Sequence, residues 1–187
     1  MNKKEISKLL AFIFSIIQIL TIAGFVIKKQ YNYSYDAIST YMSYLIFIYF
    51  ENKKKFHLEN YIKGLVILTI IGHNLLGEYF DAYNTVKFFD NMLHVFGTFA
   101  FTLFFFSIIH KTTRMVYSSK LYTFIFITSL GVCLGVLFEL IEFTLDILFK
   151  ANNQRGLLDT NLDLIANVLG AILAGVFAVI RQSPSAH

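Results

Sequence analysis

The chain has 187 residues, of which 56% are hydrophobic and 15% are charged. A soluble domain of this length carries about 25% charged residues, so the composition excludes an ordinary soluble domain and indicates an integral membrane protein. The net charge of +4 does not indicate nucleic-acid binding, because the basic residues are scattered between apolar runs instead of forming one patch.

The apolar runs predict an all-α fold: a polytopic membrane helix bundle of about six transmembrane helices in a single domain, residues 1–187. The predicted spans are residues 9–27, 34–50, 61–78, 91–110, 121–149 and 162–181. The first span is too long for the apolar part of a signal peptide, and no cleavage site of small residues follows it. The second, rich in Tyr, Ser and Thr, gives the weakest signal. The fifth exceeds one crossing, so it tilts or projects beyond the membrane.

Six spans place both termini on the same side of the membrane, and the basic residues indicate which side. Eleven of the 16 Lys and Arg residues fall in segments on the side of the N-terminus. Cytoplasmic segments of membrane proteins carry the excess of basic residues, so we expect both termini in the cytoplasm. Most acidic residues fall toward the outer side: Asp36, Glu78, Asp81, Asp90, Glu139, Glu142, Asp146, Asp159 and Asp163.

The last two spans carry acidic residues that a lipid-facing helix would exclude, because a charge at the bilayer centre costs roughly 3 kcal/mol or more. Glu139 and Glu142 are three residues apart and share one helix face. Asp163 and Asn167 are four apart and form a second polar stripe. The polar turn between the spans, ANNQRG, is short, so the two helices should be antiparallel neighbours. We therefore predict that the two acidic faces look at each other.

The fourth span opens with Asp90 and His94, four residues apart. Helical bundles build metal sites from acids and histidines at such spacings, so this pair predicts a site that faces the acids of the hairpin. The predicted ligands of a divalent metal ion are His94, Glu142 and Asp163, a set that suits a hard or borderline ion. The structural alternative is that Asp90 caps the helix and accepts a hydrogen bond from His94, and that the two glutamates pair with a base to hold the hairpin.

The further candidate binding residues are His73, Glu78, Arg155, Asp159 and Asn167. In an α-helix, His73 shares a face with Gly77, which favours helix packing over ligand binding, whereas Glu78 shares a face with Asn74. Arg155 and Asp159 fit the N-terminus of the sixth span, where an acid is favoured by the helix dipole. Arg155 alternatively binds a phosphate head group.

The segment FDNMLHVFGTF, together with GVLFELIEF and GLLDTNLDLIANVLGA, resembles the VanZ-like membrane proteins and most closely their uncharacterised bacterial YjdF-like branch. The resemblance covers residues 73–174. In that family an Asp and a His open one helix, a Glu pair lies in the next, and an Asp-rich segment ends in Asn-x-x-Gly. The matching positions are Asp90, His94, Glu139, Glu142, Asp159, Asp163, Asn167 and Gly170. The resemblance implies a role in the bacterial envelope, because the better-known members are linked to glycopeptide resistance.

Three functions remain open at this point. The first is a multi-pass protein of the bacterial cytoplasmic membrane that acts as an envelope or lipid-handling enzyme. Its outward-facing site would act on a lipid or cell-envelope substrate, with membrane lipids and no nucleic acid as partners. The candidate catalytic residues are Asp90, His94, Glu139, Glu142 and Asp163. The second is a small transporter that binds a cation or proton with the same acids, although the apolar inner halves of the last three spans argue against a continuous water path. The third is an accessory protein without catalysis.

Overall fold

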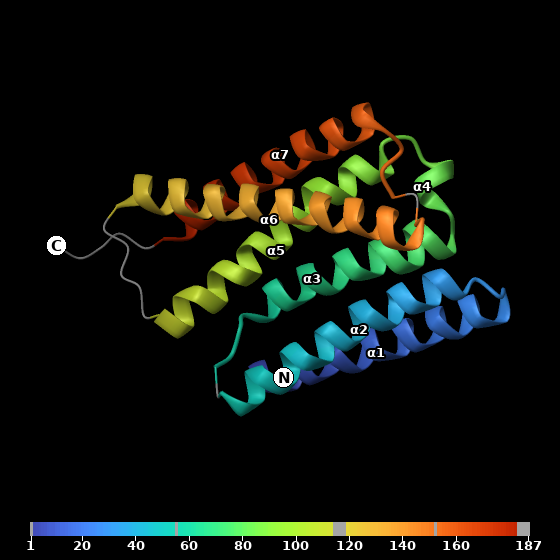
Figure 1. Ribbon diagram of the computed structural model, residues 1–187. Coiled ribbons are helices and arrows are strands. Elements are labelled where there is room, and N and C mark those ends of the chain that lie inside the picture. The colour runs from blue at the N-terminus through green and yellow to red at the C-terminus, as the bar shows by residue number, and fades with distance from the viewer. Residues whose placement is uncertain (1, 55, 114–118, 152, 183–187) are drawn as a thin grey trace. The chain divides into compact units, whose positions relative to one another are not determined.

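The computed structural model describes residues 2–54, 56–113, 119–151 and 153–182, and nearly all of them are helical (Figure 1). The elements are α1 (Lys3–Ile27), α2 (Tyr31–Lys53), α3 (Asn60–Ile71), the π-helix η1 (Gly72–Tyr79), α4 (Ala82–Thr85), α5 (Phe89–Thr113), α6 (Lys120–Phe149) and α7 (Leu157–Arg181). The all-α prediction is confirmed, and each predicted span falls within these helices.

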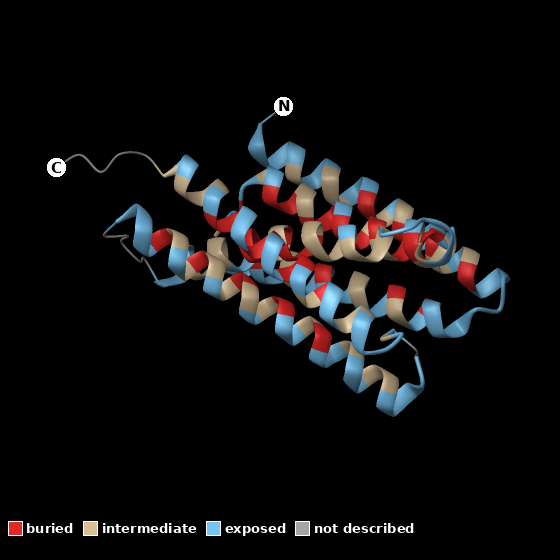
Figure 2. Ribbon diagram, turned by 90° about the horizontal axis from the view of Figure 1, so that it is seen from above, coloured by how far each residue is buried: buried red, intermediate tan, exposed pale blue. Residues whose placement is uncertain are grey.

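Among the described residues, four helices are long and apolar enough to cross a membrane: α1, α5, α6 and α7. Exposed positions recur along these helices (Figure 2). They include large apolar side chains, and Ile27 and Leu157 are each 81% exposed. Membrane helices pack through small and polar residues and leave large apolar side chains to the acyl chains, which is the distribution seen here. The helices α2 and α3 do not meet these criteria of length and composition. Six spans, and the cytoplasmic position of the termini, therefore stay predictions.

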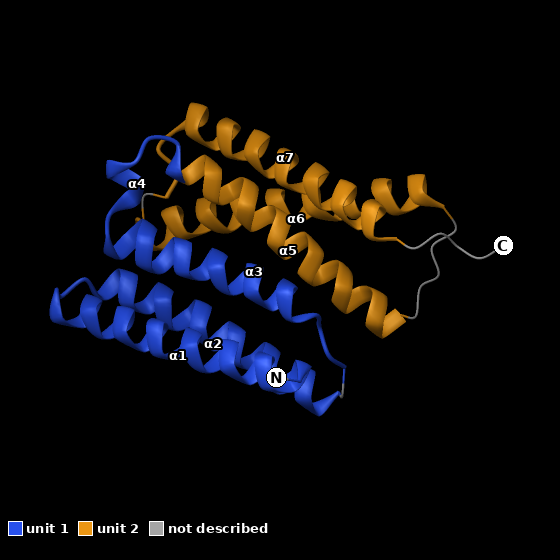
Figure 3. Cartoon of the chain, turned by 180° about the vertical axis from the view of Figure 1, so that it is seen from behind, with its two compact units in different colours: residues 1–89 blue, residues 90–187 orange. Residues whose placement is uncertain are grey.

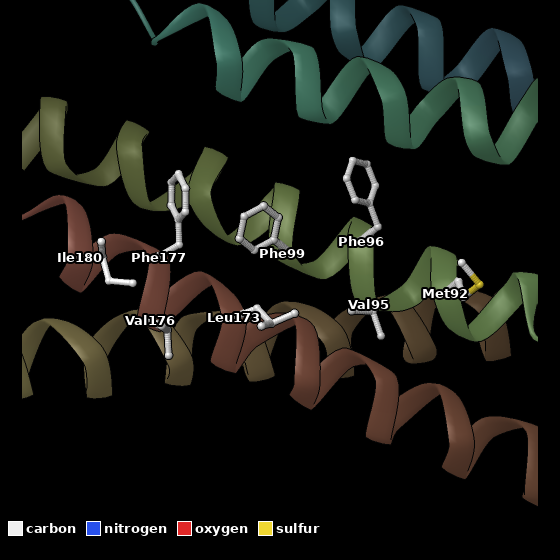
Figure 4. A pocket seen from close by; sticks show the side chains of 8 residues that line it. All are labelled: Met92, Val95, Phe96, Phe99, Leu173, Val176, Phe177 and Ile180. Atoms are coloured by element: carbon white, nitrogen blue, oxygen red, sulfur yellow. The ribbon is translucent and has the colours of Figure 1, made fainter.

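The chain divides into two compact units, residues 1–89 and 90–187 (Figure 3). In the first unit α1 begins with a capping box, in which Asn2 and Glu5 satisfy each other's backbone N–H groups at 2.9 Å. The buried face of α1 packs against α2 in antiparallel fashion, because Phe14 contacts the ring of Tyr44 whereas Gln18 Nε2 donates to the carbonyl of Ala37. The prediction of one domain over the whole chain remains a prediction.

The third predicted span changes its helical form part-way along. The 12 residues of α3 lead directly into the 8 residues of η1, so the helical path continues to Tyr79. Together they supply about 20 residues, the length that a bilayer crossing needs. After η1 the chain turns at Asp81, whose φ of 60° lies in the left-handed region, and enters the short helix α4.

The second unit consists of α5, α6 and α7, and glycines set how closely they approach. A Cβ added to Gly131 would lie 2.6 Å from the Cβ of Ala171, and one added to Gly135 would lie 2.6 Å from the Cβ of Asn167. The residue numbers of these contacts rise along α6, from 131 to 135, while they fall along α7, from 171 to 167. The two helices are therefore antiparallel neighbours, as the short turn predicted. Gly170 of α7 faces α5, where an added Cβ would meet the backbone oxygen of Val95 at 2.3 Å.

Candidate functional site

A cluster of ionisable side chains lies within the second unit, where α5, α6 and α7 meet. On α5, Asp90, His94 and Thr98 follow one another at intervals of four residues and therefore share one face. His94 is central, and its side chain is 11% exposed. We call Asp90, His94, Glu139, Glu142 and Asp163 the His94 cluster.

Four carboxylates surround the His94 imidazole. Its Nε2 atom lies 3.5 Å from Asp90, 3.8 Å from Glu142 and 3.9 Å from Asp163. Its Nδ1 atom lies 3.6 Å from Glu139. The convergence of His94 with the acids of the hairpin, expected from their matched positions in the spans, is thus observed. Even a fully protonated imidazole would leave a formal charge of −3 among these five residues if all four acids were ionised.

Asn167 orients the imidazole from the side of Nδ1. Its Oδ1 atom accepts a hydrogen bond of 2.6 Å from Thr98 and lies 3.3 Å from His94 Nδ1. Since an amide oxygen only accepts, Nδ1 must carry a proton for the second contact to be a hydrogen bond. The Asn167 Nδ2 atom donates to Glu139 at 3.2 Å and to the carbonyl of Gly135 at 3.4 Å. This network leaves Nε2 as the ring nitrogen that faces three of the acids.

The acids differ in their access to the surroundings. The side chains of Asp163 and Glu139 are 3% and 6% exposed, whereas those of Asp90 and Glu142 are 22% and 29% exposed. Polar neighbours satisfy the buried pair: Asn91 donates to Asp163 at 2.8 Å, and Gln154 Nε2 donates to the Glu139 carboxylate at 3.4 Å. Buried carboxylates therefore form the floor of the cluster, and the more exposed ones form its rim.

The geometry of the His94 cluster offers two overlapping sets of metal ligands. Ligand atoms of Asp90, His94 and Asp163 lie within 4.8 Å of one another, and so do those of His94, Glu139 and Glu142. The predicted ligands His94, Glu142 and Asp163 are thus divided between the two sets. Oxygen ligands with one imidazole suit Mg²⁺, Mn²⁺ or Zn²⁺.

Comparison with known proteins places the chain in a family. Residues 9–184 match the family described as "Predicted membrane protein (DUF2238)". The chain belongs to this family. An uncharacterised protein of Thermotoga maritima is similar to it, with 39% identity over 112 residues, which are 58% of this chain and 56% of that protein. The chain thus matches a little over half the length of this relative. No solved structure matches the chain.

Membership of the DUF2238 family agrees with the helical membrane bundle, and the remaining predicted residues can be located within it. Asp159 accepts a hydrogen bond of 3.0 Å from the backbone N–H of Arg155, just before α7 begins. This is the helix-terminal arrangement that the sequence suggested, although α7 begins at Leu157, five residues before the predicted span. Asp146 accepts hydrogen bonds from the backbone N–H groups of Asn153 and Gln154, so it holds the turn between α6 and α7.

His73 and Glu78 lie in the first unit, in η1, and do not belong to the His94 cluster. Sequence reasoning missed Asn91, Thr98 and Gln154 as partners of the cluster. Thr98 could have been found, because it lies four residues beyond His94 on the same stripe. Gln154 lies in the turn after α6, where no periodicity marks the direction of a side chain.

Proposed function

We propose that the His94 cluster binds a divalent cation and is the site of an envelope or lipid-handling enzyme in the bacterial cytoplasmic membrane. The observation that carries this proposal is a single imidazole within 4 Å of carboxylates from three helices. Such a concentration of negative charge in a membrane protein needs a compensating proton or cation. The imidazole nitrogen adds a ligand that a purely structural acidic cluster does not require.

The network around His94 suggests a role for each residue. Because Asn167 holds Nδ1, the Nε2 atom is left as a ligand, and Asp90 and Asp163 complete the set around it. A divalent ion held there would polarise an oxygen of the substrate and activate a bound water. Glu142 lies on the rim near the same nitrogen and is positioned to take the proton of that water. Glu139 lies on the Nδ1 side of the imidazole, where it accepts a hydrogen bond from Asn167 and so helps to hold the ring in place.

The packing of α6 against α7 next to the cluster, at Gly131 and Gly135, favours a closed site over a transport path. At Gly131 and Gly135 the backbones of α6 and α7 approach so closely that an added methyl group would collide with Ala171 or Asn167. Thr102 also lies against Gly131, because an added Cβ would be 2.6 Å from its Oγ1 atom. A cation or proton path would need water to continue through this region, so transport ranks below the enzyme. Cation or proton flux into liposomes that disappears in Glu139→Gln would reverse this order.

Kinship with the VanZ-like proteins, and with their YjdF-like branch, is part of the proposal. It is supported by the way the residues of that motif adjoin one another: Asp90, His94, Glu139, Glu142, Asp163 and Asn167 all belong to one network. The same proposal places the cluster at the outer leaflet and both termini in the cytoplasm. Its substrate is a lipid or a component of the cell envelope, and its neighbours are membrane lipids.

The test is metal content combined with complementation. The purified full-length protein should contain a divalent metal, and His94→Gln should lose one equivalent of it. His94→Gln and Glu142→Gln should each fail to restore the lipid profile of a deletion strain. Glu59→Gln is the matched control, because it removes the same charge from a side chain that is 48% exposed. A protein without metal, whose His94 and Glu142 variants still complement the deletion, would refute the proposal.

A further inference from the structure

We propose that the first unit holds a second divalent-cation site, formed by Asp36 of α2 with His73 and Glu78 of η1 and oriented by Tyr83 of α4. This site shares no residue with the His94 cluster and does not depend on the function proposed for it. Its ligand class is a borderline divalent ion such as Zn²⁺ or Mn²⁺, because two carboxylates and one imidazole suit these ions and leave positions for water or substrate.

The ligand atoms already surround one point. His73 Nε2 lies 2.9 Å from Asp36 Oδ2 and 3.8 Å from Glu78 Oε1. Ligand atoms of the three residues all lie within 4.8 Å of one another. Two ligands bound about 2.1 Å from one ion lie roughly 3–3.5 Å apart, so only a small closure of Glu78 is needed. The side chains of His73 and Asp36 are 35% and 36% exposed, which leaves the site open to an arriving ion.

A buried oxygen of Glu78 independently points to a missing ligand. The Glu78 side chain is only 10% exposed, and its Oε2 atom is buried with no hydrogen-bond partner. A buried carboxylate oxygen without a donor is costly, because it loses its hydration without replacement. Its other oxygen faces the ring nitrogen of His73, so the carboxylate is directed into the site. A cation held by both oxygens of the Glu78 carboxylate would satisfy it.

The π-helix is the backbone feature that brings His73 and Glu78 together. In an α-helix, residues five apart point about 140° away from each other. In a π-helix the backbone hydrogen bond joins residues five apart, so their side chains lie on the same side. Gly72–Tyr79 has this form, and His73 and Glu78 are five residues apart within it. Such local departures from the α-helix are frequent at functional sites.

Tyr83 fixes the orientation of the imidazole. Its hydroxyl lies 2.6 Å from His73 Nδ1. Its ring packs over Gly77, where an added Cβ would lie 2.3 Å from a ring carbon, so a larger residue would displace it. With Nδ1 donating to the hydroxyl, the Nε2 lone pair is directed at Asp36 and Glu78, as in metal sites where an outer partner selects the tautomer. The competing arrangement is a hydrogen-bond chain in which the hydroxyl donates to Nδ1 and Nε2 donates to Asp36.

The experiment uses the full-length chain in detergent, carrying His94→Gln and Asp163→Asn so that the other cluster is disabled. After treatment with a chelator, titration with Zn²⁺ and with Mn²⁺ followed by calorimetry should show one equivalent of at least one of the two ions bound. Glu78→Gln and Asp36→Asn should each weaken its binding at least tenfold, and Tyr83→Phe should weaken it about 10–100-fold without abolishing it. Asp81→Asn is the control, because it removes a neighbouring exposed charge, and asparagine tolerates the left-handed backbone at that position.

Two outcomes would overturn the proposal. One is the absence of binding of either ion to a chain that melts cooperatively in the same detergent, which would favour the hydrogen-bond chain. The other is binding that survives both Glu78→Gln and Asp36→Asn. If Glu78→Gln fails to fold, Asp36→Asn still decides the matter, since its side chain is more than a third exposed. A rise in melting temperature with added metal, present in the starting chain and lost in Asp36→Asn, is the second readout.

Discussion

Lys63 and Glu51 form an ion pair in the interior of the first unit, and its loss should destabilise the protein strongly. Lys63 Nζ lies 2.7 Å from Glu51 Oε2, and the two side chains are 2% and 3% exposed. The pair joins three helices, because Lys63 also donates to Ser7 of α1 at 2.8 Å while Glu51 accepts from the backbone of Leu58. Lys63→Met leaves the buried Glu51 carboxylate with the Leu58 N–H and with His57 at 4.0 Å, which should cost about 3–5 kcal/mol of unfolding free energy.

Equilibrium unfolding in mixed micelles measures this cost. The chain contains no Trp, so the helical signal in far-ultraviolet circular dichroism is the appropriate probe. The double variant Glu51→Gln/Lys63→Met should be more stable than Lys63→Met alone, because it removes both charges and retains an acceptor for the Leu58 N–H. Lys3→Met is the control: its pair with Glu59 is 3.4 Å long and largely exposed, so it should cost less than about 1 kcal/mol. A Lys63→Met chain as stable as the control would refute the reasoning.

Three further predictions concern the second unit and the topology. Gly170→Ala should lose about 1–3 kcal/mol in the same unfolding assay, because the new methyl group meets a backbone oxygen of α5. Gly64→Ala should lose nothing, since nothing lies within 4 Å of an added Cβ. Asn167→Ala should weaken cation binding at the His94 cluster about 10–100-fold by releasing the imidazole, and unchanged affinity would contradict the role given to Asn167. In a Cys133→Ala chain, an impermeant thiol reagent applied to intact cells should spare cysteines at Asn52, Thr112 and Ser185, the last outside the described residues. It should label those at Asn32, Asn84 and Asn153, and a labelled position 112 would overturn the six-span topology.

Hydrophobic runs predicted the helices well, because a span must satisfy its backbone within itself and so shows an uninterrupted apolar pattern. The ends were less accurate. α1 begins at Lys3 and not near residue 9, since a helix continues outside the apolar region when a capping box such as that of Asn2 and Glu5 is available. α7 likewise begins earlier than predicted, because the polar residues Asp159, Thr160 and Asn161 interrupt the apolar pattern although they are helical. The short helix α4 was not predicted, since four residues carry no usable periodicity.

Of the His94 cluster, the sequence indicated the acids but not the network that orients them. The cost of a carboxylate in a bilayer makes Glu139, Glu142 and Asp163 conspicuous in an apolar chain. Asn167 was placed on the correct stripe, yet its hydrogen bonds to both His94 and Thr98 depend on how α5 packs against α7, which no local pattern contains. Asp90 approaches Nε2, the same nitrogen that faces Glu142 and Asp163, whereas Asn167 contacts the ring at Nδ1.

His73 and Glu78 were both candidate binding residues, but their spacing did not indicate that they form a pair, whereas the spacing of Asp90 and His94 did. His94 has its partner on the same helix four residues away, at Asp90, and an α-helical pattern finds such a pair. His73 has its partner five residues away, at Glu78, and the same pattern assigns these two residues to different faces. Only the π-helical form of η1 brings them to one side, and that form is not evident from apolar periodicity. A histidine and an acid five residues apart in a membrane helix are therefore worth testing against both helical forms before the pair is dismissed.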